Sequence, residues 1–189
     1  VAGREPDIRE RNVLRAIYVA CLDHTPATPS SLAAVSCYSG GNSLKTALAA
    51  GVATMGETHA GAGEGAAKVF REFMEPLRKA REKSESFQVD GLRITTLAEL
   101  AEYMVDKITG VYGGEKRRIP GYGHRYYSQF GVDPRAEALF EIAGELGVAG
   151  EYCALARAVE SCLRDKKAPG LCINVDGLIG ALLCDMNLP

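Results

Sequence analysis

Residues 64–83 read EGAAKVFREFMEPLRKAREK, and apolar side chains recur along them every three or four positions. This spacing is typical of one face of a long helix that packs against a core. The apolar face consists of Ala66, Val69, Phe70, Phe73, Met74 and Leu77. Similar spacing continues on both sides of the segment, so the sequence predicts an all-α fold.

Glycine, proline and serine clusters divide the rest of the chain into further helical segments. Helices are expected at residues 8–22, about 30–38, 44–55, 97–109, 134–147, 151–165 and 171–186. Thr96 and Glu99 have the spacing of a capping box, which starts one of these helices. Residues 87–94, FQVDGLRI, depart from the helical pattern because they alternate around an Asp-Gly pair, and they predict one small β-hairpin.

Composition excludes several classes of protein. The 189 residues can bury a sizeable core, and 22 basic against 24 acidic residues leave a net charge of −2. Such a balance creates no broad field for nucleic acid or an anionic membrane surface. No apolar run approaches the ~20 residues of a membrane span, and the charged N-terminal region is unlike a signal peptide. We therefore expect a cytoplasmic protein, with both chain ends cut from a longer one.

The three histidines and one aspartate stand in short segments rich in glycine, proline or charge. His24 lies in LDHTPA, His59 in ETHAGAG, His124 in PGYGHR and Asp176 in INVDGLIG. A helix start favours a neutral imidazole at His59 and an ionised carboxylate at Asp176, although aspartate is also a common helix cap. Neutral donors and one base suit proton abstraction next to a carbonyl, with the enolate held by hydrogen bonds.

Several cationic side chains admit two interpretations. Arg135 could form a bidentate pair with a substrate carboxylate, but its spacing favours an ion pair with Asp133 or Glu137. A basic run precedes His124, and it is either solvated or available to phosphate groups of a nucleotide-bearing ligand. This run consists of Lys116, Arg117 and Arg118.

Three other motifs fail a closer test. The 61–65 run GAGEG has no preceding strand and places its third glycine one residue early for a dinucleotide-binding fingerprint. The 40–46 segment GGNSLKT has Leu44 where a phosphate loop requires glycine. The histidines are 35 and 65 positions apart, and the six cysteines lack metal-ligand spacing, so we predict no metal site and reduced structural cysteines. A metal-dependent hydrolase is retained as an alternative.

Taken together, the motifs resemble the citrate synthase superfamily. The matching blocks are ETHAGA at 57–62, PGYGHR at 120–125 followed by DPR at 133–135, and NVDG at 174–177. The segment 23–25 and the small-residue helix after Gly41 match as well, in the right order along most of the chain. The resemblance implies a two-domain helical fold, with 1–58 and 171–189 in a truncated large domain and 59–170 in a small domain.

The resemblance also implies the chemistry, which is to make or break the carbon–carbon bond between acetyl-CoA and oxaloacetate. Asp176 would take the methyl proton, His59 would bind the thioester carbonyl and His124 the oxaloacetate carbonyl. His24 and Arg135 would hold carboxylates of the oxo-acid. Coenzyme A would enter as the substrate thioester, with no permanently bound cofactor, along the loop Ile119, Pro120, Gly121, Tyr122 and Gly123.

Within the superfamily, the segments NVDGLIG and AAKVF favour citryl-CoA lyases and the lyase part of ATP citrate lyase. His59 instead favours citrate synthases. We interpret the chain as citryl-CoA lyase-like, with citrate synthase proper and a non-catalytic helical subunit as alternatives. A homodimer or higher oligomer is expected by resemblance. The chain ends before the helices that usually supply a further arginine, and Ser128 stands where many synthases have arginine.

Overall fold

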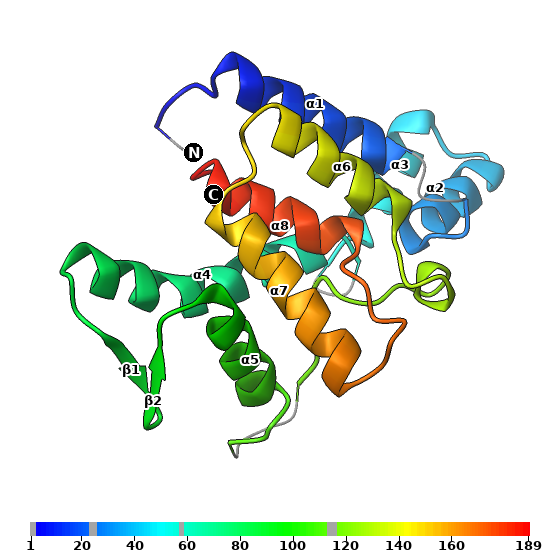
Figure 1. The fold of residues 1–189 in the computed structure, drawn as a ribbon. Coiled ribbons are helices and arrows are strands. Elements are labelled where there is room, and N and C mark those ends of the chain that lie inside the picture. The colour runs from blue at the N-terminus through cyan, green and yellow to red at the C-terminus, as the bar shows by residue number, and fades with distance from the viewer. Residues whose placement is uncertain (1–2, 23–25, 57–58, 113–116) are drawn as a thin grey trace.

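The computed structural model describes residues 3–22, 26–56, 59–112 and 117–189, and these confirm the all-α prediction (Figure 1). The helices in this part of the chain are α1 (Ile8–Leu22), α2 (Pro29–Ser39), α3 (Leu44–Ala53), α4 (Ala62–Glu82), α5 (Leu97–Ile108), α6 (Pro134–Glu145), α7 (Glu151–Lys166) and α8 (Val175–Asp185). A 3-10 turn, η1 (Tyr127–Gln129), lies between α5 and α6.

The predicted hairpin is also confirmed. Strands β1 (Phe87–Val89) and β2 (Leu92–Ile94) pair antiparallel, with Phe87 opposite Ile94. Asp90 and Gly91 both have positive φ, at 49° and 78°, as a tight turn between twisted strands requires. Next along the chain, the capping box of Thr96 and Glu99 starts α5 as predicted.

The core is built around α8, which contacts α4, α6 and α7 and crosses the middle of the molecule in Figure 1. The apolar face predicted for 64–83 is largely buried, and Phe70 and Met74 have no solvent exposure. Pro76 lies inside α4 without ending it. The predicted division into residues 1–58 with 171–189 against 59–170 stays a prediction.

Helix α8 begins at Val175, so the expected start at residue 171 was wrong. Residues before it run alongside the 121–123 loop instead, where Tyr122 and Ile173 form an isolated antiparallel bridge. The buried carboxylate of Glu160 accepts a hydrogen bond from the Ile173 amide at 3.0 Å. Asn174 then caps the helix by accepting from the Gly177 amide at 3.0 Å. The backbone amides that a longer helix would have used are thus bonded elsewhere.

Four glycines allow backbone segments to touch in this core. Gly121 has φ of +85°, and a Cβ atom there would lie 2.3 Å from the Cα of Gly177. A Cβ on Gly177 would lie 2.3 Å from the Gly121 carbonyl oxygen, and one on Gly180 would lie 2.7 Å from that of Gly63. No side chain fits at such distances. The 121–123 loop and the start of α4 therefore rest directly on α8.

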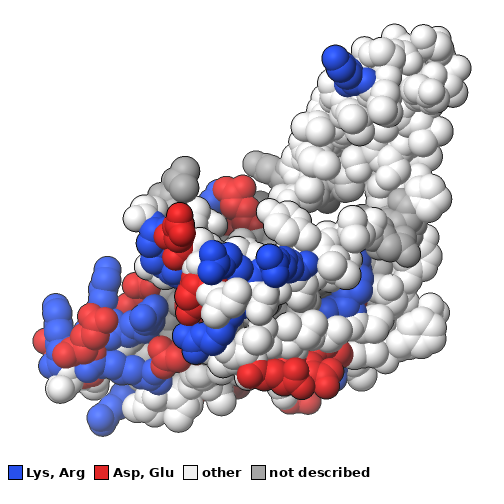
Figure 2. All heavy atoms as spheres, turned by 90° about the horizontal axis from the view of Figure 1, so that it is seen from above, with Lys and Arg blue, Asp and Glu red and all other residues white. Residues whose placement is uncertain are grey.

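The helical hairpin α2–α3 (residues 29–53) projects from this core, at the right in Figure 1. Its two helices pack mainly on each other. Within 26–56 the sequence has a single charged residue, Lys45, and Figure 2 shows the projecting end of the molecule almost without charge. In the described part of the chain, no helix is both long and apolar enough to cross a membrane.

We expect Gly177→Ala to lower the free energy of unfolding by about 1–3 kcal/mol, because the new methyl group collides with backbone that cannot move aside. Gly144→Ala is the matched control, since nothing lies within 4 Å of a Cβ at that helical position. The control should gain about 0.5–1 kcal/mol. Urea unfolding followed by circular dichroism measures both values. Equal effects of the two substitutions would contradict the tight contact.

Candidate active site

His59 and Asp176 line the same pocket, which has a volume of about 560 Å³. His59 lies just before α4, and Asp176 is in the first turn of α8. The start of α4 packs closely on α8, since a Cβ atom on Gly63 would lie 3.4 Å from the Asp176 carbonyl oxygen. This packing brings His59 and Asp176 to the same pocket. Other residues that line this pocket are Cys21, Leu22, Pro26, Thr28, Ser30, Ser31, Met55 and Ala60.

The imidazole of His59 is held by a residue that the sequence analysis missed. Nε2 of His59 lies 2.9 Å from Oγ of Ser30, at the start of α2. If the hydroxyl donates to Nε2, the neutral ring carries its proton on Nδ1, where it can donate to a ligand. Ser30 precedes His59 by 29 positions, so no local pattern in the sequence could have paired them.

Asp176 is available for a role other than capping. The cap of α8 is Asn174, whose side chain accepts the Gly177 amide hydrogen bond. The carboxylate of Asp176 is in the first turn, where the helix dipole favours negative charge. Burial is the main cause that raises the pKa of Cys21, and the charge of Asp176 raises it further. The negative charge of Asp176 therefore acts on the thiol of Cys21, which lines the same pocket.

His124 lines a neighbouring pocket of about 620 Å³ instead. Its Nδ1 accepts hydrogen bonds from the amides of Tyr126 at 3.1 Å and Tyr127 at 3.4 Å. An accepting Nδ1 carries no proton, so this geometry selects the neutral ring with the proton on Nε2. Such a ring can donate one hydrogen bond to a carbonyl oxygen.

The pocket at His124 is strongly basic. Its cations are Arg117, Arg118, Arg125 and Lys167. Three residues of the predicted coenzyme A loop also line it, namely Ile119, Tyr122 and Gly123. The other two face elsewhere, since Gly121 lies against Gly177 and Pro120 lies beside Gly65. The loop therefore reaches from the basic pocket to within one residue of Asp176.

Arg135 pairs with Asp133, as its spacing favoured. The Asp133 carboxylate has no solvent exposure and accepts hydrogen bonds from Nε and Nη2 of Arg135, at 3.0 and 2.8 Å. Burial works to raise the pKa of Asp133, but the hydrogen bonds and charge of Arg135 outweigh it and lower that pKa. The pair is thus ionised, and the Nε–Nη2 edge of the guanidinium is occupied.

Some sequence predictions fall outside this geometry. His24 and Lys116 lie outside the described residues. Among the residues that are described, no cluster of three histidine, cysteine or acidic side chains could hold a metal ion.

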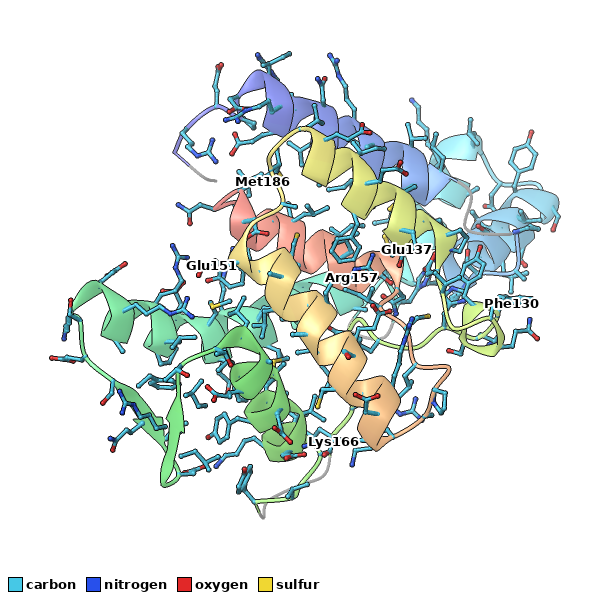
Figure 3. All side chains as sticks on the ribbon, in the orientation of Figure 1. Phe130, Glu137, Glu151, Arg157, Lys166 and Met186 are labelled. Carbon is cyan, nitrogen blue, oxygen red and sulfur yellow. The ribbon has the colours of Figure 1, made fainter. Side chains whose placement is uncertain are left out.

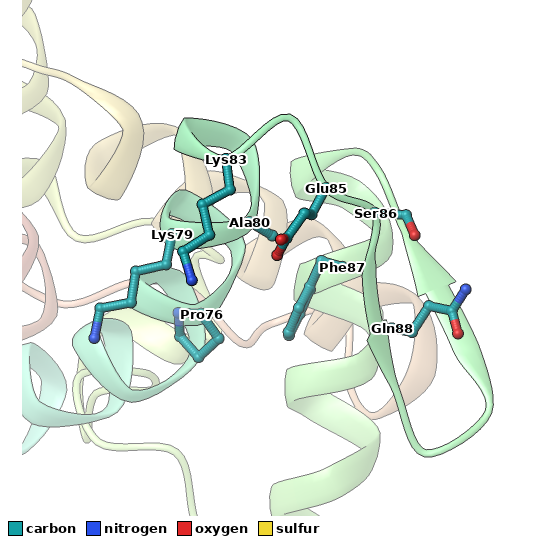
Figure 4. A pocket seen from close by; sticks show the side chains of 8 residues that line it. All are labelled: Pro76, Lys79, Ala80, Lys83, Glu85, Ser86, Phe87 and Gln88. Atoms are coloured by element: carbon teal, nitrogen blue, oxygen red, sulfur yellow. The ribbon is translucent and has the colours of Figure 1, made fainter.

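A third pocket, of about 610 Å³, lies between the end of α4 and β1 and includes Lys79, Lys83 and Phe87 (Figure 4). None of the candidate site residues lines it.

The comparisons with known proteins agree with the fold and the motifs. A family model described as citrate synthase, C-terminal domain, matches residues 1–189. A citryl-CoA lyase from Hydrogenobacter thermophilus superimposes with a TM-score of 0.73 and 33% sequence identity, covering 98% of this chain and 62% of that one.

Two further similarities concern larger proteins. An ATP citrate lyase from Methanothrix soehngenii, solved with citrate and coenzyme A, has a TM-score of 0.70 and 25% identity, covering 97% of this chain and 26% of that one. ATP-citrate synthase beta chain protein 1 of Arabidopsis thaliana is 30% identical over 166 residues, which are 88% of this chain and 23% of that protein. The chain spans 23% of the length of the plant and fungal relatives and 12–13% of that of the mammalian ones. By its family match and its fold, the chain belongs to the citrate synthase family.

Proposed function

We propose that this chain carries the acyl-CoA site of an enzyme that makes or breaks the carbon–carbon bond between acetyl-CoA and oxaloacetate, and that its physiological reaction is citryl-CoA cleavage. The observation that carries the proposal is the shared pocket of His59 and Asp176. The citryl-CoA lyase similarity, with 33% identity over 98% of the chain, supports the direction of the reaction. An imidazole donor and a carboxylate base in one pocket suit the formation of an enolate.

In the condensation direction, the Asp176 carboxylate removes a proton from the methyl group of acetyl-CoA. His59 donates a hydrogen bond to the thioester oxygen, on which negative charge develops. The enolate carbon then attacks the ketone carbon of oxaloacetate, and the electron pair of the carbonyl π bond moves to the ketone oxygen. His124 donates its Nε2 proton to that oxygen, which becomes the hydroxyl group of citryl-CoA. Cleavage of citryl-CoA runs through the same steps in reverse, and Asp176 returns the proton to carbon.

The loop of residues 119–123 is proposed to carry coenzyme A between the two pockets. The phosphates of coenzyme A would bind Arg117, Arg118 and Lys167, since guanidinium and ammonium groups bind phosphate through charge-assisted hydrogen bonds. The thioester end would follow Gly121 to the start of α8. Carboxylates of the oxo-acid are assigned to Arg135 and His24.

We also propose that the protein is a homo-oligomer assembled through the α2–α3 hairpin. Apolar side chains on this hairpin are strongly exposed in the single chain, including Val35 at 63%, Leu48 at 58% and Val52 at 62%. A second copy of the same uncharged surface is the occupant that this surface fits, because a charged partner would be desolvated without compensation. The cytoplasmic location stays a prediction.

The test of the reaction supplies full-length protein with citryl-CoA and measures acetyl-CoA and oxaloacetate. A lyase releases both without free thiol. A parallel mixture of acetyl-CoA and oxaloacetate is followed with a thiol reagent, because a citrate synthase liberates coenzyme A. Thiol release without lyase turnover assigns the synthase reaction instead. Binding of acetyl-CoA with neither activity assigns a non-catalytic subunit.

Asp176→Asn should lower kcat by about 100- to 10,000-fold, because the amide cannot accept the methyl proton. Binding of acetyl-CoA, measured by calorimetry, should change little. Asp165→Asn is the matched control, since Asp165 is exposed near the end of α7 and lines neither pocket. Full turnover by Asp176→Asn would exclude this carboxylate as the base.

Leu48→Glu should convert the oligomer to monomers, because each new contact would bury two facing carboxylates. Sedimentation equilibrium at micromolar concentration measures the mass. Leu92→Glu, on β2, is the control, with 40% exposure outside the hairpin. A monomeric wild-type protein, or an unchanged mass for Leu48→Glu, contradicts assembly through α2–α3.

A further inference from the structure

Tyr127 contacts two of the candidate substrate-binding residues at once. Its ring centroid lies 4.6 Å from that of His124, with an angle of 32° between the ring planes. The guanidinium carbon of Arg135 lies over the same Tyr127 ring, 5.3 Å from the centroid. Aromatic rings attract both an offset neighbouring ring and a cation above the face. One side chain therefore sets the separation between the two residues.

The contact with His124 is made by the backbone as well. The amide of Tyr127, the first residue of the 3-10 turn, donates to Nδ1 of His124 at 3.4 Å. The backbone and the ring of Tyr127 therefore both contact this imidazole. The neighbouring Tyr126 also donates its amide to Nδ1 of His124, at 3.1 Å, but its ring lies farther from the imidazole than the ring of Tyr127 does. Its ring centroid lies 6.0 Å from that of His124, and the residue is 53% exposed.

The contacts from His124 through Tyr127 to Arg135 extend further, through Asp133, to α8. Asp133, the partner of Arg135, also accepts a hydrogen bond from the amide of Val175 at 3.1 Å. Val175 precedes Asp176 and is the first residue of α8. These contacts therefore join His124, which lines the basic pocket, to the helix turn that carries Asp176 in the other pocket. Of the three linking side chains, Tyr127, Arg135 and Asp133, only Tyr127 can be altered without removing a charge.

We propose that Tyr127 is a positioning residue for this site. Its ring holds the carbonyl donor His124 at a fixed distance from the carboxylate anchor Arg135, and so selects substrates that carry a carbonyl or hydroxyl carbon beside a carboxylate. This inference rests on the proposed function of those two residues. The ring acts through His124 and Arg135, and the phenol hydroxyl is not required.

The test compares Tyr127→Phe, which keeps the ring, with Tyr127→Leu, which removes it, in the full-length protein. Loss of the ring should lower kcat by about 100-fold and raise KM for the oxo-acid or citryl-CoA by about 10-fold, since a misplacement of about 1 Å has effects of this size. KM for acetyl-CoA should stay within about 2-fold. Tyr127→Phe should retain both constants within about 3-fold, as should the matched control Tyr126→Leu.

A second readout is independent of turnover. The ring protons of His124 in the NMR spectrum should be shifted by the ring current of Tyr127 in the wild type and in Tyr127→Phe, and lose that shift in Tyr127→Leu. If leucine unfolds the loop, Tyr127→Met replaces it, because methionine fills irregular space.

The outcomes separate this inference from the proposed function. An active wild type with an equally active Tyr127→Leu overturns the positioning role alone. Equal losses in Tyr127→Phe and Tyr127→Leu overturn it too, because they assign the role to the hydroxyl. An inactive wild type in both assay directions overturns the proposed function, and the NMR shifts then decide only whether the ring holds His124.

Discussion

Direct backbone contact between α8 and its neighbours is the constraint on which this structure depends. Gly177 and Gly180 allow the 121–123 loop and the start of α4 to lie against the helix with no side chain between them. The same contact brings Asp176 and His59 to one pocket and places the His124 loop next to the first turn of α8. Residues 59, 121 and 176 are far apart in the chain, so packing of small residues, and no local motif, assembles the site.

Hydrogen bonds then hold the segments that the glycines bring together. The amide of Gly123 donates to the carbonyl of Cys172 at 2.7 Å, and the Asn174 side chain donates to the carbonyl of Gly123 at 2.8 Å. On α7, Glu160 is almost fully buried and forms ion pairs with Arg157 and Arg164 of the same helix. A third ion pair, Glu137 with Arg157, joins α6 to α7 nearby (Figure 3). Charged side chains of α7 thus support the turn that leads into α8.

Most of the fold could be predicted from the sequence because its signals are local. Helical periodicity, the Asp-Gly turn at residues 90–91 and the Thr96–Glu99 capping box each depend on neighbours within a few positions. The start of α8 could not be predicted in this way, since the bonds that Glu160 and the 121–123 loop make to residues 172–174 are long-range. The candidate residues His59, His124 and Asp176 were found through glycine-containing motifs, and Arg135 through the segment Asp133-Pro134-Arg135. The placement of His59 and Asp176 in one pocket and of His124 in another, and the contacts of Ser30 and Tyr127, required coordinates.

Ser30 has a consequence beyond the orientation of one imidazole. It stands at the first turn of the projecting hairpin, yet its hydroxyl contacts His59 inside the pocket. Any binding event that shifts the base of α2 by a fraction of an ångström therefore changes the environment of that ring. By thermodynamic reciprocity, a ligand that tightens around His59 also changes the affinity of whatever covers the hairpin. If the protein assembles through the hairpin as proposed, Ser30 is a contact through which ligand occupancy and assembly would be coupled.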